Sequence, residues 1–453
     1  MASLREHIIA ILEELKRIQA IEKFPNVEDG FPSLMSTGDR GSFFVTQKIE
    51  SEVKAVAGIL LQNDSHASRQ FTVSEWKKLV RQAIGPALGR VDLDHDPAEN
   101  AETILAAVRK TIGESRMTYG PLHCAVGCTL FGNFDVKPIV MGPVRIETRE
   151  DWLERNRIDG TITSVTAKRL ERLWSSGRRS KKLKKPIDQM REQDVIDAIG
   201  NCPFVCSIQT DGLAPETGKD KALIAGRMAF AAISLLWQKP SNALDGFRLS
   251  VDGDVRVLKV LAFVPGKVTL AGQKLSHLPA GYTFKLGEWN EQATGAAYLF
   301  DVAGKILEFF LHPNGQVARP ELMNTLMQAL LWFHEGCRET IGAMAVVKFA
   351  SVLDALSCGR EVEGIRKLLT ARVGFKNDSI ITKSSGLTMK QAVDQLYHGG
   401  RSRTVHGTNE KLMHDWEEMR NLAEILARLC LISSMYWAFQ NPTEYDPRKL
   451  SIP

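Results

Sequence analysis

The sequence predicts an α+β protein, in which a mixed α/β N-terminal region is followed by a C-terminal all-α helical bundle. Three observations predict this class. Strand-like runs alternate with helical periodicities through the first part of the chain. These strand signals end near Arg319, where Pro320 suits the first position of a helix. Amphipathic helical patterns then follow one another, as in an antiparallel bundle.

Composition and charge favour a soluble protein. The 453 residues carry a formal net charge of +5, with 44% hydrophobic and 25% charged residues, which is ordinary for several globular domains. The small positive excess permits a nucleic-acid partner without requiring one. Seven cysteines, an odd number, argue against a secreted disulfide framework. The charged, amphipathic N-terminus is unlike a signal peptide, and the late apolar run of about 14 residues is shorter than the roughly 20 of a membrane span. We therefore expect a cytoplasmic protein with no membrane partner.

Residues 1–185 form the first predicted region, which we regard as a possible sensing domain. Helical spacing predicts helices at 8–15 and 49–60, and residues 117–143 are strand-like. The acidic loop at 92–100 resembles the start of an EF-hand, but it lacks the required glycine and the closing glutamate. We therefore do not expect calcium there.

A basic run, RRSKKLKK, marks the next predicted boundary. Such a run is either a solvated connector or a non-specific contact for RNA. Residues 186–317 form a predicted second α/β subdomain, which contains a strand at 205–208, a helix at 222–237 and a hairpin at 247–264 that turns at Asp252-Gly253.

Residues 318–453 form the predicted bundle. The apolar spacing predicts helices at 320–337, 344–356 and 387–397, with Gly399-Gly400 closing the third, and a final helix of about 28 residues from Leu412.

Charged side chains gather in the connection before the last predicted helix. Arg401, Arg403 and His406 lie within six residues there, behind two glycines. Arginine offers a planar fork suited to phosphate, and histidine titrates near neutral pH. The orphan N–H groups of the next helix, capped by Thr408 or Asn409, would also favour an anion. A phosphate clamp and a proton shuttle are a minimal set for cleaving RNA without metal, because RNA carries its own 2′-OH nucleophile.

The run Arg401-Ser-Arg-Thr-Val-His406 matches the R-x4–6-H motif of HEPN domains. The preceding Leu396-Tyr397, the following Gly407 and the apolar helix that ends in Ser351-Val-Leu-Asp354-Ala-Leu356 resemble the ApeA-like branch of that family. The resemblance covers roughly residues 320–439.

The resemblance implies a metal-independent endoribonuclease with no cofactor, of the kind found in prokaryotic antiphage defence by abortive infection or in toxin systems. It implies a homodimer that brings two motifs into one cleft, and products with 2′,3′-cyclic phosphate and 5′-OH ends. Arg401 would orient the phosphate and His406 would perform acid–base chemistry on the RNA substrate. The residues expected to contact that substrate are Ser402, Arg403, Thr404 and Asp354. The N-terminal region would sense a phage-derived or nucleic-acid trigger.

Two alternatives stay open. The arginines could pair with acids of a neighbouring helix and His406 could be an interface residue, which would make the bundle an inactive HEPN scaffold or an RNA-binding dimerisation module. The pairs Cys124/Cys128 and Cys202/Cys206 are either buried core thiols, which we favour, or a zinc site. The chain has no phosphate-binding loop of the NTPase type and no HExxH or GxSxG motif.

Overall fold

The computed structural model describes residues 2–19, 33–132, 136–178, 181, 183–252, 257–259, 262–265, 267–269, 273–275, 287–313, 315, 317–382 and 386–453. The chain is 65% helix and 10% strand, and its C-terminal part is mostly helical, which confirms the predicted α+β class. Contacts divide the chain into two compact units, which we describe separately. Unit 1 comprises residues 1–122, 210–220 and 312–314, and unit 2 comprises residues 123–209, 221–311 and 315–453.

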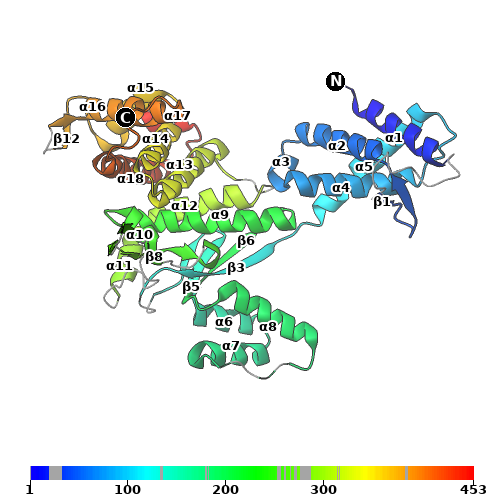
Figure 1. Cartoon of the computed structure of the whole chain (residues 1–453), viewed down its shortest axis with the longest axis horizontal. Coiled ribbons are helices and arrows are strands. Elements are labelled where there is room, and N and C mark those ends of the chain that lie inside the picture. Colours follow the sequence, from blue (N-terminus) through cyan, green and yellow to red (C-terminus); the bar gives the residue numbers. More distant parts are fainter. Residues whose placement is uncertain are drawn as a thin grey trace. The chain divides into compact units, whose positions relative to one another are not determined.

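Unit 1 consists mainly of helices, drawn in blue to cyan in Figure 1. Its elements are α1 (Leu4–Gln19), β1 (Ser33–Ser36), β2 (Ser42–Val45), α2 (Gln47–Gln62), α3 (Ala67–Gln70), α4 (Val73–Leu88) and α5 (Pro97–Met117). The two strands pair in antiparallel fashion. The helices predicted at 8–15 and 49–60 are confirmed, because Ile8, Ile11 and Ile49 all lie buried in one shared core.

One carboxylate, Glu75, organises two helix starts in unit 1. Thr72 and Glu75 form a reciprocal capping box at the start of α4. The same carboxylate accepts hydrogen bonds from the backbone N–H groups of Glu216 at 2.8 Å and Thr217 at 3.2 Å, in the first turn of α9 (Pro215–Ser234). A negative charge is favourable there because the first N–H groups of a helix have no partner within it.

Unit 2 contains a five-stranded sheet with the order β4-β5-β6-β3-β7. The strands are β3 (Leu122–Thr129), β4 (Ile139–Met141), β5 (Val144–Thr148), β6 (Phe204–Thr210) and β7 (Arg248–Leu249). Side chains alternate between the two faces of a strand, and both faces are covered by helices (Figure 1). On one face, Cys206 and Ile208 share a core with α9 and α12 (Ala297–Leu311), whereas Val205 packs with three other helices on the opposite face.

The helices that cover the second face are α6 (Arg149–Ile158), α7 (Ser164–Ser176) and α8 (Pro186–Ile199). The basic run at 178–185 lies between α7 and α8 along the chain. Residues 179, 180 and 182 lie outside the described part of the chain, so both roles of this run stay predictions. Two short helices, α10 (Pro240–Gly246) and α11 (Glu288–Gly295), complete this half of unit 2.

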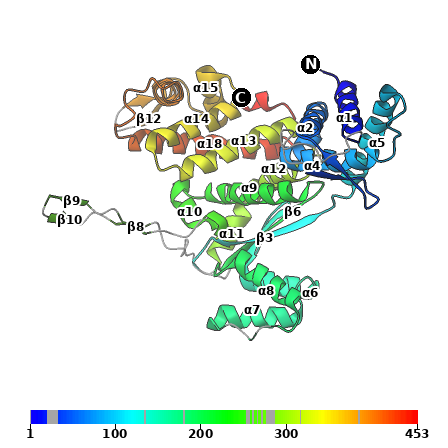
Figure 2. The same cartoon turned by 45° about the vertical axis from the view of Figure 1, so that its right-hand side comes forward.

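The C-terminal bundle packs on the far side of α9 and α12 from the sheet (Figure 2). Its helices are α13 (Pro320–Arg338), α14 (Gly342–Leu356), α15 (Glu361–Val373), α16 (Met389–Asp394), a π-helix at Gln395–Ser402, α17 (Arg403–Val405) and α18 (Glu417–Gln440). A small antiparallel pair, β12 (Ile380–Thr382) and β13 (Leu387–Thr388), precedes α16, and a 3-10 turn at Pro447–Ser451 ends the fold. The helices predicted from 320 and 344 are confirmed.

The last helix differs from the prediction. It begins at Glu417 rather than at Leu412, and Trp416 precedes it without a side-chain cap, so neither Thr408 nor Asn409 caps it. The indole Nε1 of Trp416 donates to the Lys411 carbonyl at 2.9 Å, which stabilises a turn where helix was expected. By length and composition α18 could cross a bilayer, but half of that apolar window is buried in the bundle.

The predicted hairpin at 247–264 is also wrong in its pairing. β7 pairs with β3, whereas β8 (Val257–Lys259) pairs with β11 (Gln273–Leu275) and β9 (Ala262–Val264) pairs with β10 (Lys267–Thr269). The strands on either side of Asp252 therefore do not pair with each other, and Gly253 lies outside the described residues. An Asp-Gly dipeptide favours a turn locally, but the open edge of β3 offers β7 a partner within the larger sheet.

Candidate functional site

The motif segment, which we define as Arg401–His406, begins inside a π-helix. α16 begins at Met389, and the hydroxyl of the preceding Thr388 forms a capping box with Gln391. The helix then widens into the π-helix Gln395–Ser402 and continues into α17. The predicted stop at Gly399-Gly400 is therefore wrong, since the helix runs through both glycines. π-helical turns are rare and occur frequently at functional sites.

Close packing explains the second of these glycines. Gly400 is buried against α14, and a Cβ atom at this position would lie 2.6 Å from Cγ1 of Val346. Leu396 and Tyr397 of the same turn are also buried. Gly400 thus permits the π-helix to approach α14, whereas a Cβ at Gly399 would meet no heavy atom within 4 Å.

The guanidinium of Arg401 is held by two side chains. Its Nη2 lies 2.9 Å from Oδ2 of Asp354 at the end of α14, and its Nη1 donates to the Tyr397 hydroxyl at 2.9 Å. The guanidinium carbon also lies 5.0 Å from the centre of the Tyr397 ring, within the range of a cation–π contact. The structure therefore brings two of the predicted site residues, Arg401 and Asp354, into direct contact, and adds Tyr397, which was not among the predicted site residues.

The electrostatics of this group follow from its partial burial. Burial, and after it the negative charge of Asp354, raises the pKa of Tyr397, so its hydroxyl stays protonated at neutral pH. Within the described part of the chain, Oδ1 of Asp354 is buried and has no hydrogen-bond partner. The carboxylate thus fixes Arg401 through one oxygen and keeps acceptor capacity on the other.

The remaining motif residues are exposed or, in the case of Ser402 and Thr404, half-buried. His406 and Arg403 are exposed, and the backbone N–H of His406 donates to the Ser402 carbonyl at 3.0 Å. The Thr404 hydroxyl accepts a hydrogen bond from Nδ2 of Asn409 at 2.7 Å. Across the residues that the structure describes, no hydrogen bond or ion pair joins the His406 side chain to Arg401 or Asp354. The chain therefore presents a guanidinium held by two side chains and, five positions later, an accessible imidazole.

Of the four cysteines considered for a zinc site, Cys128 and Cys206 pack in the core, whereas Cys124 and Cys202 are only half-buried. Cys128 and Cys206 are fully buried on neighbouring strands, and burial raises the pKa of Cys206 to about 12 and that of Cys128 well above its usual value. Both thiols therefore stay protonated, which disfavours metal binding. Among the described residues, no group of three or more His, Cys, Asp or Glu side chains could hold a metal ion.

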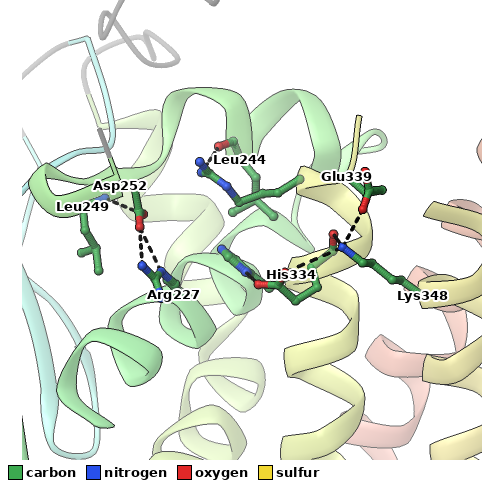
Figure 3. A network of polar contacts seen from close by, with 9 residues as sticks. Arg227, Leu244, Leu249, Asp252, His334, Glu339 and Lys348 are labelled. Carbon is green, nitrogen blue, oxygen red and sulfur yellow. Dashed lines mark hydrogen bonds and ion pairs between the residues drawn. The ribbon is translucent and has the colours of Figure 1, made fainter. Parts of the chain in front are cut away.

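A second polar cluster connects α9, α13 and α14 (Figure 3). Nη2 of Arg227 on α9 lies 2.6 Å from Oδ1 of Asp252, and Nζ of Lys348 on α14 lies 2.8 Å from Oε2 of Glu339. Between these pairs lies the buried His334, whose Nδ1 is 3.1 Å from Oε1 of Glu335. Arg227 and Lys348 are each paired with an acid, so the cluster joins helices and we assign it no chemistry.

Comparison with known proteins adds no further assignment. The chain matches no family model, no curated protein and no solved structure.

Proposed function

We propose that the C-terminal bundle is a metal-independent RNA endonuclease of HEPN type. The observation that carries this proposal is the arrangement of the motif segment, in which Asp354 and Tyr397 hold Arg401 while His406 stays accessible. An arginine has five N–H donors, so its contacts with two partners leave others for a phosphate. Orienting groups of this kind are what a preorganised site needs.

The chemistry uses the ribose as nucleophile. His406 takes the proton of the 2′-OH, and the 2′-oxygen forms a bond to the adjacent phosphorus. The bond from phosphorus to the 5′-oxygen breaks, and that oxygen takes up a proton from an acid such as the protonated imidazole of a second copy or water. Arg401 stabilises the additional negative charge on the phosphorane. The products are a 2′,3′-cyclic phosphate and a 5′-OH end.

Regulation forms part of the same proposal. Uncontrolled RNA cleavage would harm the host cell, and a large α/β region accompanies the small bundle. We propose that this region senses a phage-derived or nucleic-acid trigger and that the enzyme acts as a homodimer in antiphage defence.

A binding module is the second candidate, favoured by the ion pair itself. Because Arg401 is already neutralised by Asp354, the bundle could be an inactive HEPN scaffold or an RNA-binding dimerisation module. The two candidates differ in whether the imidazole of His406 is needed to break a bond.

The test compares wild type with Arg401→Ala and His406→Ala during phage infection. RNA integrity and cell growth are measured in each case. His123→Ala, an exposed histidine on the sheet, is the matched control. We expect the wild type and the control to cut RNA, also in EDTA with purified protein, and both motif variants to lose about 100-fold or more of the rate. Equal cutting by His406→Ala, or intact RNA throughout infection with the wild type, contradicts the proposal.

A further inference from the structure

A groove in unit 2 borders the motif segment on the side of Arg403. Its volume is about 1020 Å³, at the upper end of the roughly 300–1,000 Å³ typical of sites for small ligands. It lies between the first half of α18, the turn that precedes this helix, the β12–β13 pair and the π-helix. Arg401 and His406 do not line it, so it is a surface distinct from the Arg401–Asp354 contact.

The rim of this groove is polar and places two cations, Arg403 and Lys411, in or close to the motif segment. The side chains involved are Gln395, Arg403, Asn409, Lys411, His414 and Asn421. Arg403, Lys411 and His414 are exposed. Two acids, Asp415 and Glu418, also line the groove. Oδ1 of Asp415 accepts the backbone N–H of Glu417 at 2.9 Å, so this carboxylate is directed at the start of α18.

The floor of the groove is apolar. Leu422, Ile425 and Leu429 line it from successive turns of α18, and Ile425 is 48% exposed although it is a large aliphatic side chain. Trp416 also lines the groove, and its hydrogen bond to the Lys411 carbonyl fixes the indole. An aromatic ring beside aliphatic contacts is the type of surface on which an unstacked base packs.

A hydrogen bond and the chain itself connect the groove to the motif segment. Asn409, which lines the groove, donates to the Thr404 hydroxyl inside the motif at 2.7 Å. Arg403, also in the lining, directly follows Ser402 at the end of the π-helix. A ligand in the groove would therefore lie beside the segment that carries His406.

We propose that this groove binds a ribonucleotide of single-stranded RNA next to the phosphodiester that is cut. Arg403 and Lys411 bind phosphate, the amides contact base edges, and the base packs between Trp416 and the apolar floor. Exposed cations and amides above this floor fit a nucleotide better than the apolar face of a second copy. The assignment rests on the proposed function, because it makes the groove the substrate subsite of the Arg401–His406 segment.

The test measures binding separately from cleavage. In the His406→Ala background, a fluorescein-labelled single-stranded oligoribonucleotide is titrated by anisotropy at several salt concentrations. Gly399→Phe fills the groove from a position where a Cβ meets no atom, and we expect it to weaken binding at least about tenfold, the loss expected when one stacked base is displaced. Gly113→Phe, at an equally open helical glycine of α5, is the matched control and should bind like the parent.

The salt dependence tests the two cations. Arg403→Ala and Lys411→Ala should each lower the slope of log affinity against log salt by about 0.7, the value for one phosphate contact on a single strand. Lys367→Ala, an exposed lysine on α15 outside the groove, should leave the slope unchanged.

The outcomes separate the two proposals. Unchanged RNA affinity in Gly399→Phe overturns the groove assignment and leaves cleavage by Arg401 and His406 standing. Binding through the groove by a wild-type protein that cuts no RNA overturns the nuclease and leaves the groove as an RNA-binding site that is not a substrate subsite. If Gly399→Phe instead converts a dimer to a monomer in sedimentation with RNA affinity intact, the groove is a subunit contact and the assignment fails, as it does if the parent binds no RNA.

Discussion

Gly399 and Gly400 are adjacent in the chain, but packing requires a glycine at only one of the two positions. Gly400 lies against Val346, and Gly399 borders open space. Both positions lie inside the π-helix rather than at its end. The requirement at Gly400 is therefore steric, and at Gly399 no such requirement exists.

We expect Gly400→Ala to lower the free energy of unfolding by about 1–3 kcal/mol, because the added methyl overpacks the contact with α14. Gly399→Ala, the control, should be neutral or stabilising by less than about 1 kcal/mol, since alanine restricts the unfolded chain. Urea titration followed by circular dichroism measures both. Equal destabilisation by the two changes would contradict the packing argument.

We expect that lysine, the other side chain with a full positive charge at neutral pH, cannot replace Arg401 in the site. Arg401→Lys keeps the charge but replaces a planar fork that contacts Asp354 and Tyr397 together. We expect RNA cleavage by Arg401→Lys to fall at least about tenfold, while Arg403→Lys, at an exposed position, keeps the catalytic step. Single-turnover cleavage rates at saturating RNA separate this effect from binding. If Arg401→Lys cleaved RNA as fast as the wild type, a positive charge at this position would be sufficient for cleavage.

The residue types of the site could be found in the sequence, but not their contacts. Arg401 and Asp354 were both proposed, and the structure joins them at 2.9 Å. Tyr397 was noted only as part of a resemblance, although its spacing of four from Arg401 permits contact on one helix face. Gly400 was misread as a cap because the close approach of Val346 depends on tertiary packing, which local patterns do not report.

At the scale of elements, charged side chains determine how helices are joined. Asp252 has an 8% exposed side chain and depends on Arg227, which binds it across two segments of unit 2 (Figure 3). Glu75 plays a comparable role in unit 1, where it receives N–H groups at the starts of α4 and α9.

We expect Arg227→Ala to destabilise unit 2 by about 3 kcal/mol or more, because it leaves a buried carboxylate without its cation. The double variant Arg227→Ala/Asp252→Ala should recover part of that loss, since no unpaired charge remains. Thermal unfolding of the wild type, the two single variants and the double variant forms a double-mutant cycle, which measures the coupling free energy of the pair. Additive losses would show that the pair is not coupled.

Glu75 should make unit 1 sensitive to acid. Burial would raise the pKa of Glu75, but hydrogen bonds from Thr217, Thr72 and Glu216 outweigh it and lower that pKa. A carboxyl with a depressed folded-state pKa contributes stability above its ordinary value, near 4.5, and loses it as the pH falls through the folded-state value. We expect Glu75→Gln to cost about 1–2 kcal/mol at pH 7 and to flatten the acid dependence. Glu102→Gln, at a 65% exposed carboxylate, should leave the profile of unfolding against pH unchanged.

Long helices were predicted more reliably than short strands and turns. The periodicity at 320–337 gave α13 nearly to its ends, because one buried face runs along many residues. The strands beside Asp252 were misassigned because β7 spans only Arg248–Leu249 and its partner, β3, is distant in sequence. The π-helix has no simple periodic pattern, so it was not anticipated.

At the scale of the whole molecule, the bundle shares its core with the rest of unit 2. One cluster of buried residues extends from Val126 on β3 to Leu450 near the C-terminus. Glu424 of α18 is 2% exposed and accepts the backbone N–H of Ser241, on α10, at 2.7 Å. The division predicted at 185 and 317 stays a prediction, because a shared core does not by itself decide what folds alone.

A fragment of residues 318–453 tests that boundary. Without α10 and α12, Glu424 loses its hydrogen-bond partner and part of the apolar face of α18 becomes exposed to water. We therefore expect the fragment either to aggregate or to unfold at a much lower temperature than the full chain. A fragment of residues 123–453 is the control, since it keeps most of the shared core. A 318–453 fragment that melts like the full chain in calorimetry would establish an autonomous domain.

The π-helix that leads into the motif also determines the direction in which the following side chains point around the helix axis. A π-turn holds one more residue than an α-turn, so the same residues wound as an ordinary α-helix would place every residue after Ser402 out of its present phase. Each following side chain would then swing by about 100° around the axis, the angle per residue of an α-helix. Arg403 and His406 would leave their present directions without any change in their identity. The spacing between arginine and histidine thus carries meaning only together with the pitch of the turn that leads into it.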